Sequence, residues 1–226
     1  DHYWTVWNNQ SAQRAFANSA WLSLSAAVLS LAVAVPFAWL LVGKGGRLLR
    51  GLNAAIDTPF ALPGIVVSIA FILAFLKPLP IVGVSLYSTA WIILLAYLAR
   101  FLALGLRPVV AAFESQDPAL DEAAQIAGAG PIRRLWRILL PAVAPAAGAG
   151  VLLIVMTAYN ELTVSALLWS QGHETVGVLV FSLYDEGAAT AAAAASVVAV
   201  LITFAAAALA TVLARWLPRG VLPWQA

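Results

Sequence analysis

The chain has 226 residues, of which 63% are hydrophobic and only 10% are charged, and its mean hydropathy is +0.93. A soluble domain of this size could not cover its surface with so few charges, so the composition excludes a soluble globular protein and predicts an integral membrane protein. The absence of cysteine excludes disulfides and thiolate metal sites, and the formal net charge of +2 becomes informative only through the positions of the charges.

The chain begins with an aromatic lead-in that is followed by a long apolar run. Residues 1–14 are polar and aromatic, so we expect them to form an external lead-in at the membrane interface. Residues 15–43 carry no charge and exceed the roughly 20 residues that a spanning helix needs, so they predict span one, with a kink at Pro36. A short basic loop containing Lys44 and Arg47 is expected to follow.

Span two is predicted at residues 58–76, with Asp57 at the start of its helix. Pro63 and Gly64 interrupt this run and should loosen the backbone inside the membrane. Such a break either exposes carbonyl groups to a translocation path or only improves the packing of helices, and the sequence is compatible with both.

Three further spans are predicted, at residues 86–106, 138–160 and 188–214. Span three contains one charge, Arg100. The long side chain of this arginine either reaches the interface near the end of the span or serves a function inside the membrane. The expected fold class is therefore an all-α membrane protein with about five transmembrane helices.

The longest polar interruption, residues 107–141, separates spans three and four and is predicted to hold two short helices. Asp117 and Pro118 suit the start of the first helix, and Gly128 ends it. Small and apolar side chains on this helix would form a narrow face suited to close approach against a partner; these are Leu120, Ala123, Ala124 and Ala127. The alternative, a helix lying on lipid headgroups, would more usually carry bulky anchors and basic residues.

Glu161 is the one carboxylate set deep in apolar sequence, on a helix that we expect to continue to about residue 169. An intramembrane carboxylate marks a pathway or a buried partner. Three interpretations stay open: a structural pair, for which Arg100 is the obvious partner, a place on the translocation path, or a loop that begins before Glu161. The candidate path residues are Glu161, Asn160, Tyr159 and Pro63.

Residues 172–187 are too short and too polar at their ends to cross a membrane, so they predict an outer loop with a short re-entrant or interfacial helix. Acidic side chains would face the mouth of the pathway; these are Glu174, Asp185 and Glu186. His173 next to one acid is weak evidence for a metal ligand, and we interpret it as a solvated loop residue. No metal site is predicted.

The basic residues predict the orientation. Nine lysines and arginines fall in the loop after span one, in residues 107–141 and in the C-terminal tail, whereas only Arg14 and Lys77 fall on the other side. The positive-inside rule then makes residues 107–141 and the C-terminus cytoplasmic and the N-terminus external.

Motifs for catalysis are missing from the sequence. There is no phosphate-binding loop, no HExxH, no GxSxG and no pair of carboxylates set for acid and base work on one face. We therefore expect a protein that is not an enzyme and that takes its energy from another subunit.

The segment with Glu122, Ala123, Ala124 and Gly128, which ends in Ile138 to Pro141, resembles the E-A-A-x3-G-x9-I-x-L-P loop of the membrane subunits of binding-protein-dependent ABC importers. The resemblance implies the type I importer fold, in which the first loop helix is a coupling helix that docks in a groove of the ATP-hydrolysing subunit. It further implies two ATP-binding subunits that hold ATP and Mg, a second permease unit, a periplasmic solute-binding protein and a place in the inner membrane. Nothing implies a cofactor bound by this chain, or a nucleic-acid partner.

Three other stretches are similar to the sulfate, molybdate and ferric-iron branch of these permeases: Asn18-Ser19, residues 62–64 and residues 160–181. The last stretch is most similar to the ferric-iron type, so ferric iron is the expected solute, with sulfate, molybdate or another small solute as the alternative. That type commonly fuses two units in one polypeptide. Because the chain starts at Asp1 and its only methionine is Met156, we expect it to be a single permease domain, residues 1–226, within such a tandem protein. A different class, an ion-coupled secondary transporter that uses Glu161 as its titrating group, is the second hypothesis.

Overall fold

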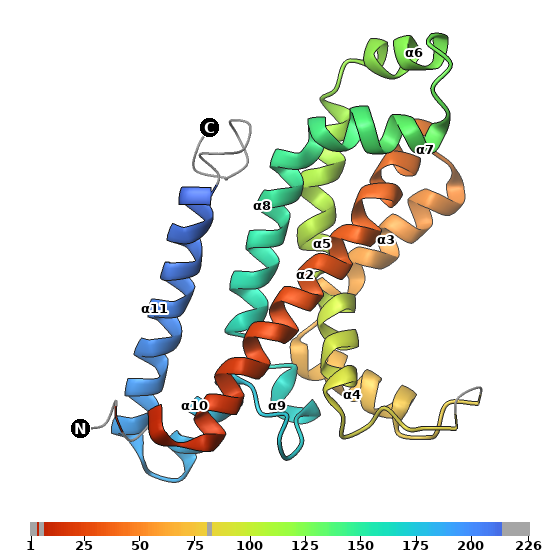
Figure 1. The fold of residues 1–226 in the computed structure, drawn as a ribbon. Helices are drawn as coiled ribbons and strands as arrows, with labels where there is room; N and C mark the ends of the chain where they lie inside the picture. Colours follow the sequence, from red (N-terminus) through yellow and green to blue (C-terminus); the bar gives the residue numbers. More distant parts are fainter. Residues whose placement is uncertain (1–3, 5–6, 81–82, 214–226) are drawn as a thin grey trace.

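The computed structural model describes residues 4, 7–80 and 83–213, and these form helices and loops without a strand (Figure 1). Part of the predicted lead-in and the basic tail lie outside the described residues. The elements in chain order are α2 (Gln10–Lys44), α3 (Arg47–Ala61), α4 (Gly64–Phe75), α5 (Ala90–Glu114), α6 (Pro118–Ile126), α7 (Pro131–Arg134), the π-helical turn η1 (Leu135–Leu139), α8 (Leu140–Tyr159), α9 (Ser165–Leu168), α10 (Val176–Asp185) and α11 (Ala189–Leu213).

Four helices are long and apolar enough to cross a membrane, and a bent pair supplies a fifth span. The four are α2, α5, the continuous helix from Pro131 to Tyr159, and α11; the pair is α3 with α4, bent by 112°. The predicted all-α fold with about five spans is therefore confirmed. The bend falls at Leu62 and Pro63, where the sequence predicted a loosened backbone.

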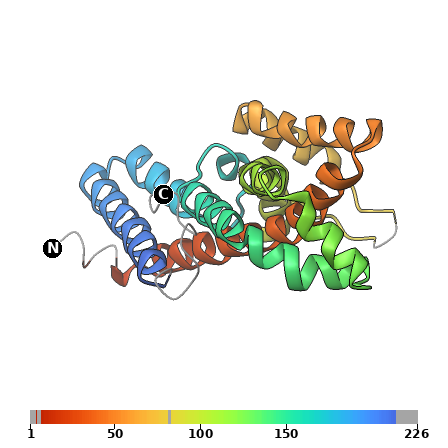
Figure 2. The same ribbon diagram turned by 90° about the horizontal axis from the view of Figure 1, so that it is seen from above.

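Helices α2, α5 and α8 form the centre of the bundle, and Figure 2 shows α5 and α8 between α11 on one side and α3 on the other. Their apolar side chains fill two buried clusters, one around Tyr97 and Phe101 and the other around Leu106 and Val143. Two glycines let α5 and α8 touch through their backbones: a Cβ on Gly150 would lie 3.0 Å from the Gly105 Cα. Small residues at such crossings are how membrane helices reach close contact.

Two predicted boundaries near span one are wrong. Helix α2 begins at Gln10, inside the predicted lead-in, because the Asn9 side chain caps it by accepting a hydrogen bond from the Ser11 N–H at 2.8 Å. Helix α3 begins at Arg47, inside the predicted basic loop, so Asp57 lies within the helix and does not start it. Its charge is balanced there by Arg107, which comes from the part of residues 107–141 that forms the end of α5.

The other end of the polar loop and the end of span four also differ from expectation. The second loop helix is continuous with span four through the π-helical turn, so it does not form a separate element. Helix α8 ends at Tyr159 and does not reach residue 169, because the side chain of Glu161 bonds to its own following turn. The predicted short helix of the outer loop is confirmed as α10, which packs against α11 and the start of α2.

Candidate functional site

Helix α6, the predicted coupling helix, lies at one end of the bundle, away from α9 and α10 (Figure 1). The Asp117 side chain accepts a hydrogen bond from the Ala119 N–H at 2.9 Å, and Pro118 occupies the first helical position. Gly128 follows the helix with φ +76°, and the Ala129 N–H donates back to the Ala124 carbonyl. This is the left-handed helix end that favours glycine, so the backbone explains why Gly128 ends α6.

The predicted docking face of α6 is only partly exposed. Leu120 is 50% exposed, and Ala123 and Ala127 are also exposed, whereas Ala124 is 7% exposed and turns toward the bundle. Glu122 is exposed as well. The exposed surface of α6 therefore combines alanines with the larger apolar side chains of Leu120 and Ile126, the latter 89% exposed, and carries the acid Glu122, a composition suited to contact with a partner.

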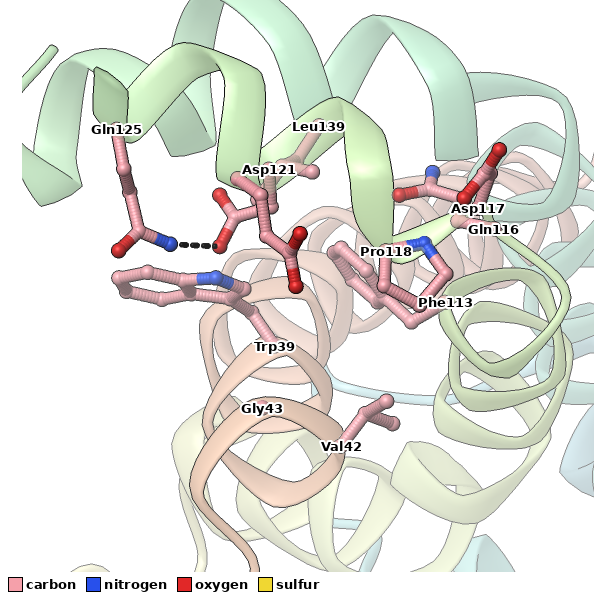
Figure 3. A pocket seen from close by; sticks show the side chains of 11 residues that line it. Trp39, Val42, Gly43, Phe113, Gln116, Asp117, Pro118, Asp121, Gln125 and Leu139 are labelled. Carbon is pink, nitrogen blue, oxygen red and sulfur yellow. Dashed lines mark hydrogen bonds between the residues drawn. The ribbon is translucent and has the colours of Figure 1, made fainter.

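A pocket of about 320 Å³ separates α6 from the bundle (Figure 3). Its lining comes from the ends of α2 and α5 and from α6; the residues include Trp39, Val42, Phe113, Gln116, Asp121 and Gln125. Helix α6 thus lies across a hollow and does not pack tightly on the spans. The part of Trp39 in lining this pocket could not be predicted, because Trp39 lies in an apolar run 82 residues before Asp121.

One ion pair ties α6 to the helix that leads into the membrane. The Arg134 guanidinium donates to an Asp121 carboxylate oxygen at 2.9 Å, and the Gln125 amide donates to the same oxygen at 3.0 Å. Since Arg134 belongs to the continuous helix from Pro131 to Tyr159, the pair connects α6 directly to span four.

A second polar region lies where span two breaks, and we call it the break zone: Leu62 to Gly64, Arg100, and residues 160–165. Arg100 donates a hydrogen bond to the Leu62 carbonyl at 2.7 Å. Gly64 is pressed against Thr163, since a Cβ on Gly64 would lie 1.9 Å from the Thr163 Oγ1. The Ser68 hydroxyl lies 3.0 Å from the Gly64 carbonyl and 2.9 Å from the Val164 carbonyl.

Glu161 does not pair with Arg100, so that interpretation is wrong. Its side chain is nearly buried, at 9% exposed, and one carboxylate oxygen accepts the Val164 N–H at 2.9 Å while the other accepts the Thr163 hydroxyl. The structure supports the interpretation in which a loop begins before Glu161, because α8 has already ended at Tyr159. A carboxylate beside its own N–H and hydroxyl donors is satisfied without a distant partner.

The other candidate path residues point in different directions. Tyr159 is buried in a cluster with Val176 and Ala199. Asn160 is exposed, and its amide donates to the Thr203 hydroxyl of α11 at 3.0 Å. Pro63 is exposed at the break. The break zone thus brings Pro63, Asn160 and Glu161 into one region but turns Tyr159 away from the exposed surface.

Asn18 and Ser19 near the start of α2, the pair that the sequence resemblance singled out without a role, hold the outer loop in place. The Asn18 amide donates to the carbonyls of Gly172 at 3.1 Å and Glu174 at 2.9 Å, and the Ser19 hydroxyl accepts the Val176 N–H at 2.8 Å. Gly177 lies so close to the loop that its Cβ would be 2.8 Å from the Glu161 carbonyl oxygen. Residues 160–168 are therefore fixed between α4 and α10.

Comparison with sequence families gives one match over most of the chain. The family described as "Binding-protein-dependent transport system inner membrane component" matches residues 26–223.

Three relatives, two of them named for different solutes, resemble the chain in sequence. The probable ABC transporter permease protein y4fN of Sinorhizobium fredii is 32% identical, over 73% of this chain and 29% of the relative. The putative 2-aminoethylphosphonate transport system permease protein PhnU of Salmonella choleraesuis is 30% identical over 74% of this chain and 59% of the relative. The Fe(3+)-transport system permease protein FbpB 2 of Haemophilus influenzae is 24% identical over 84% and 37%. The chain spans less than two thirds of each of these relatives.

Two solved structures share the fold. A bacterial ABC transporter involved in the import of the acidic polysaccharide alginate aligns with a TM-score of 0.75 at 17% identity, covering 95% of this chain and 82% of that one. An inward-facing MetNI methionine ABC transporter aligns with a TM-score of 0.69 at 21% identity, covering 93% and 100%. The arrangement of helices is therefore that of ABC importer permeases.

Proposed function

Because the chain belongs to the family of binding-protein-dependent transport system inner membrane components, we propose that it forms one permease unit of an ATP-driven importer. It is accordingly a multi-pass protein of the inner membrane and a translocation component, not an enzyme. The observation that carries the proposal is the exposed α6, which presents Glu122 and Ala123 at one end of the bundle and ends in the left-handed Gly128.

We place that end in the cytoplasm. The turn between α2 and α3, with Lys44, lies at the same end as α6, while Arg14 near the start of α2 lies at the opposite end (Figure 1). The basic residues thus gather on the side of α6, and such residues favour the cytoplasmic side. In this orientation the N-terminus is external and the C-terminus is cytoplasmic.

The proposed partners follow from the same assignment. Two ATP-binding subunits would hold ATP and Mg and dock on α6, a second permease unit, fused or separate, would complete the pathway, and a periplasmic binding protein would deliver the solute. The alginate transporter has been solved with an alginate-bound periplasmic protein, which supports a partner of that kind.

The structure offers a route from α6 to the membrane interior. Closure of the ATP-binding subunits would move α6, and the Asp121–Arg134 pair would pass the movement to the continuous helix from Pro131 to Tyr159. That helix ends next to Asn160 and Glu161 in the break zone. A rigid element that joins the two regions is the physical connection that coupling between them needs.

We propose a small solute and keep ferric iron as one candidate beside phosphonates and other small oxyanions, sulfate and molybdate included. The relatives support both, since FbpB 2 is named for Fe(3+) and PhnU for 2-aminoethylphosphonate. The secondary-transporter hypothesis loses its main support, because both oxygens of the Glu161 carboxylate are occupied by donors from its own turn.

The test is association with the ATP-binding subunit. The full-length protein in proteoliposomes should bind that subunit, and ATP hydrolysis should rise when the binding protein carries its solute. Glu122→Lys on α6 should insert normally but lose association. The matched control, Glu186→Lys, makes the same charge change at an exposed acid beyond α10 and should keep association. Equal association by both variants would contradict the assignment of α6.

A further inference from the structure

Arg100 lies within the predicted membrane span three. It is the eleventh residue of α5 and lies six residues before the end of that span, so at 1.5 Å per residue it is about 15 Å from the start of the helix and about 9 Å from the end of the span. Its side chain is half-buried. A charge at this depth is costly, so it marks a functional site unless a partner inside the protein accounts for it.

No carboxylate among the described residues accounts for the charge of Arg100. The ion pairs among the described residues join Arg14 to Glu174, Arg107 to Asp57 and Arg134 to Asp121, and Arg100 takes part in none of them. The Glu161 carboxylate in the same zone is occupied by Thr163 and Val164. The guanidinium carbon lies 6.0 Å from the centre of the Phe101 ring, a contact that leaves the charge in place.

Arg107, seven residues later on α5, provides an internal comparison. It faces the same helix, α3, but makes a forked pair with the two carboxylate oxygens of Asp57. Arg100 instead donates one hydrogen bond from Nη1 to the Leu62 carbonyl. Its Nε is buried and has no hydrogen-bond partner among the described residues. A guanidinium has five N–H donors in a planar fork, so holding one carbonyl leaves donors for a further acceptor.

The surroundings of Arg100 favour a negative ligand. The span is broken at Leu62, so a helix of 12 residues, α4, begins at Gly64 with the positive end of its dipole beside the guanidinium. Leu62 and Pro63 are exposed at this break, which makes the zone accessible from outside the bundle. A fixed positive charge with spare N–H donors binds oxyanions and repels cations.

We propose that Arg100 contacts the solute on the translocation path, and that the solute is a small oxyanion of the phosphonate, sulfate or molybdate kind and not ferric iron. This inference rests on the proposed importer function. Arg100 donates to the Leu62 carbonyl throughout, and its remaining N–H groups donate to the anion as it passes the break.

The experiment uses the full-length protein with its ATP-binding subunit in proteoliposomes. Binding proteins loaded with 2-aminoethylphosphonate, sulfate or ferric iron are supplied in turn, and uptake and ATP hydrolysis are both measured. We expect wild-type uptake of an oxyanion. Arg100→Gln, which keeps a donor for Leu62 but removes the charge, should lower that uptake about tenfold to a hundredfold, the effect of losing a charge-assisted hydrogen bond. Arg107→Gln removes a charge from the same helix and should change uptake far less.

The outcomes separate the two proposals. If no loaded binding protein stimulates ATP hydrolysis in the wild type, the importer function itself is refuted. If stimulation occurs but wild type takes up only ferric iron, or if Arg100→Gln matches wild type with the oxyanion, the inference about Arg100 is overturned and the importer function stands.

A second variant serves if Arg100→Gln does not insert. Arg100→His carries a charge that depends on pH, so its oxyanion uptake relative to wild type should rise as the pH falls from about 8 to about 6. A purely structural role at the Leu62 carbonyl predicts a ratio that does not change with pH, and that result would also overturn the inference.

Discussion

The predicted coupling loop, residues 107–141 with α6, and the break zone both interrupt an apolar chain, but they arrange their polar groups in opposite ways. Around α6, Glu122, alanines and the apolar side chains of Leu120 and Ile126 face outward, a pocket lies beneath the helix, and the Asp121–Arg134 pair ties it to the span. In the break zone, polar groups turn toward one another and glycines press the segments together. A helix that binds and releases a partner must be able to move, whereas a broken span inside a membrane must satisfy the hydrogen bonds of its own backbone.

This contrast predicts two kinds of mutant. Variants in the break zone should lower the stability of the folded protein, and variants in the coupling loop should leave stability nearly unchanged but weaken the response to the ATP-binding subunit. A coupling-loop variant that lowers stability, or a break-zone variant that leaves stability unchanged, would contradict the comparison.

The largest effect is expected from Gly64→Ala. The new Cβ would lie 1.9 Å from the Thr163 Oγ1, so α4 and residues 160–164 must separate, at a cost of roughly 3 kcal/mol or more. Thermal unfolding in detergent would show a large drop in Tm or loss of folded protein. Gly51→Ala is the matched control, because nothing lies within 4 Å of its Cβ position in α3, and its Tm should not fall.

Gly128→Val should have the next largest effect, on coupling. Gly128 has φ +76°, where a β-branched residue adds about 1–3 kcal/mol of local strain and distorts the end of α6. Because distorting only the exposed end of α6 can relieve this strain, we expect normal insertion and a nearly unchanged Tm but a loss of ATP hydrolysis stimulated by loaded binding protein. Gly128→Asn tolerates the left-handed conformation and should keep most of the stimulation. A Gly128→Val protein that is stimulated like wild type would show that the shape of α6 does not matter for coupling.

Glu161→Ala should act on stability. It removes the acceptor of the Val164 N–H and the Thr163 hydroxyl, and leaving a buried N–H unpaired costs about 1–3 kcal/mol. Glu161→Gln keeps an acceptor, so its Tm should fall less and its uptake should stay close to wild type. Abolished uptake in Glu161→Gln with an unchanged Tm would instead restore the hypothesis that Glu161 is a titrating transport group.

The difference between the regions also explains what the sequence could predict. The five spans, the break at Pro63, helix α6 and its end at Gly128 depend on hydropathy and on local backbone preferences, which a single sequence displays. The start of α3 at Arg47 was missed because the charge of Asp57 is balanced by Arg107, fifty residues later.

The pairing of Arg100 with Glu161, one of three interpretations that the sequence left open, was suggested because these are opposite charges in apolar sequence, and the structure does not contain it. Glu161 accepts hydrogen bonds from Thr163 and Val164, two and three residues away, and such local bonds cost little chain entropy. Arg100 can donate to the Leu62 carbonyl only because the span breaks there. Hydropathy reveals that a span is interrupted, but the groups that meet at the interruption depend on packing between helices.

The smallest effect is expected from Asp121→Asn, which tests how firmly α6 is held. The pair with Arg134 is partly exposed, with side-chain exposures of 33% and 13%, so solvent screening limits its contribution to about 1 kcal/mol or less. The Tm should hardly change, yet stimulation of ATP hydrolysis should fall, because the pair is the ionic link between α6 and the helix entering the membrane. Exchanging the two residues, Asp121→Arg with Arg134→Asp, should restore part of the stimulation. If the single variant lowers Tm as much as Glu161→Ala does, α6 is a fixed part of the bundle. The ability of α6 to move then cannot be what distinguishes it from the break zone.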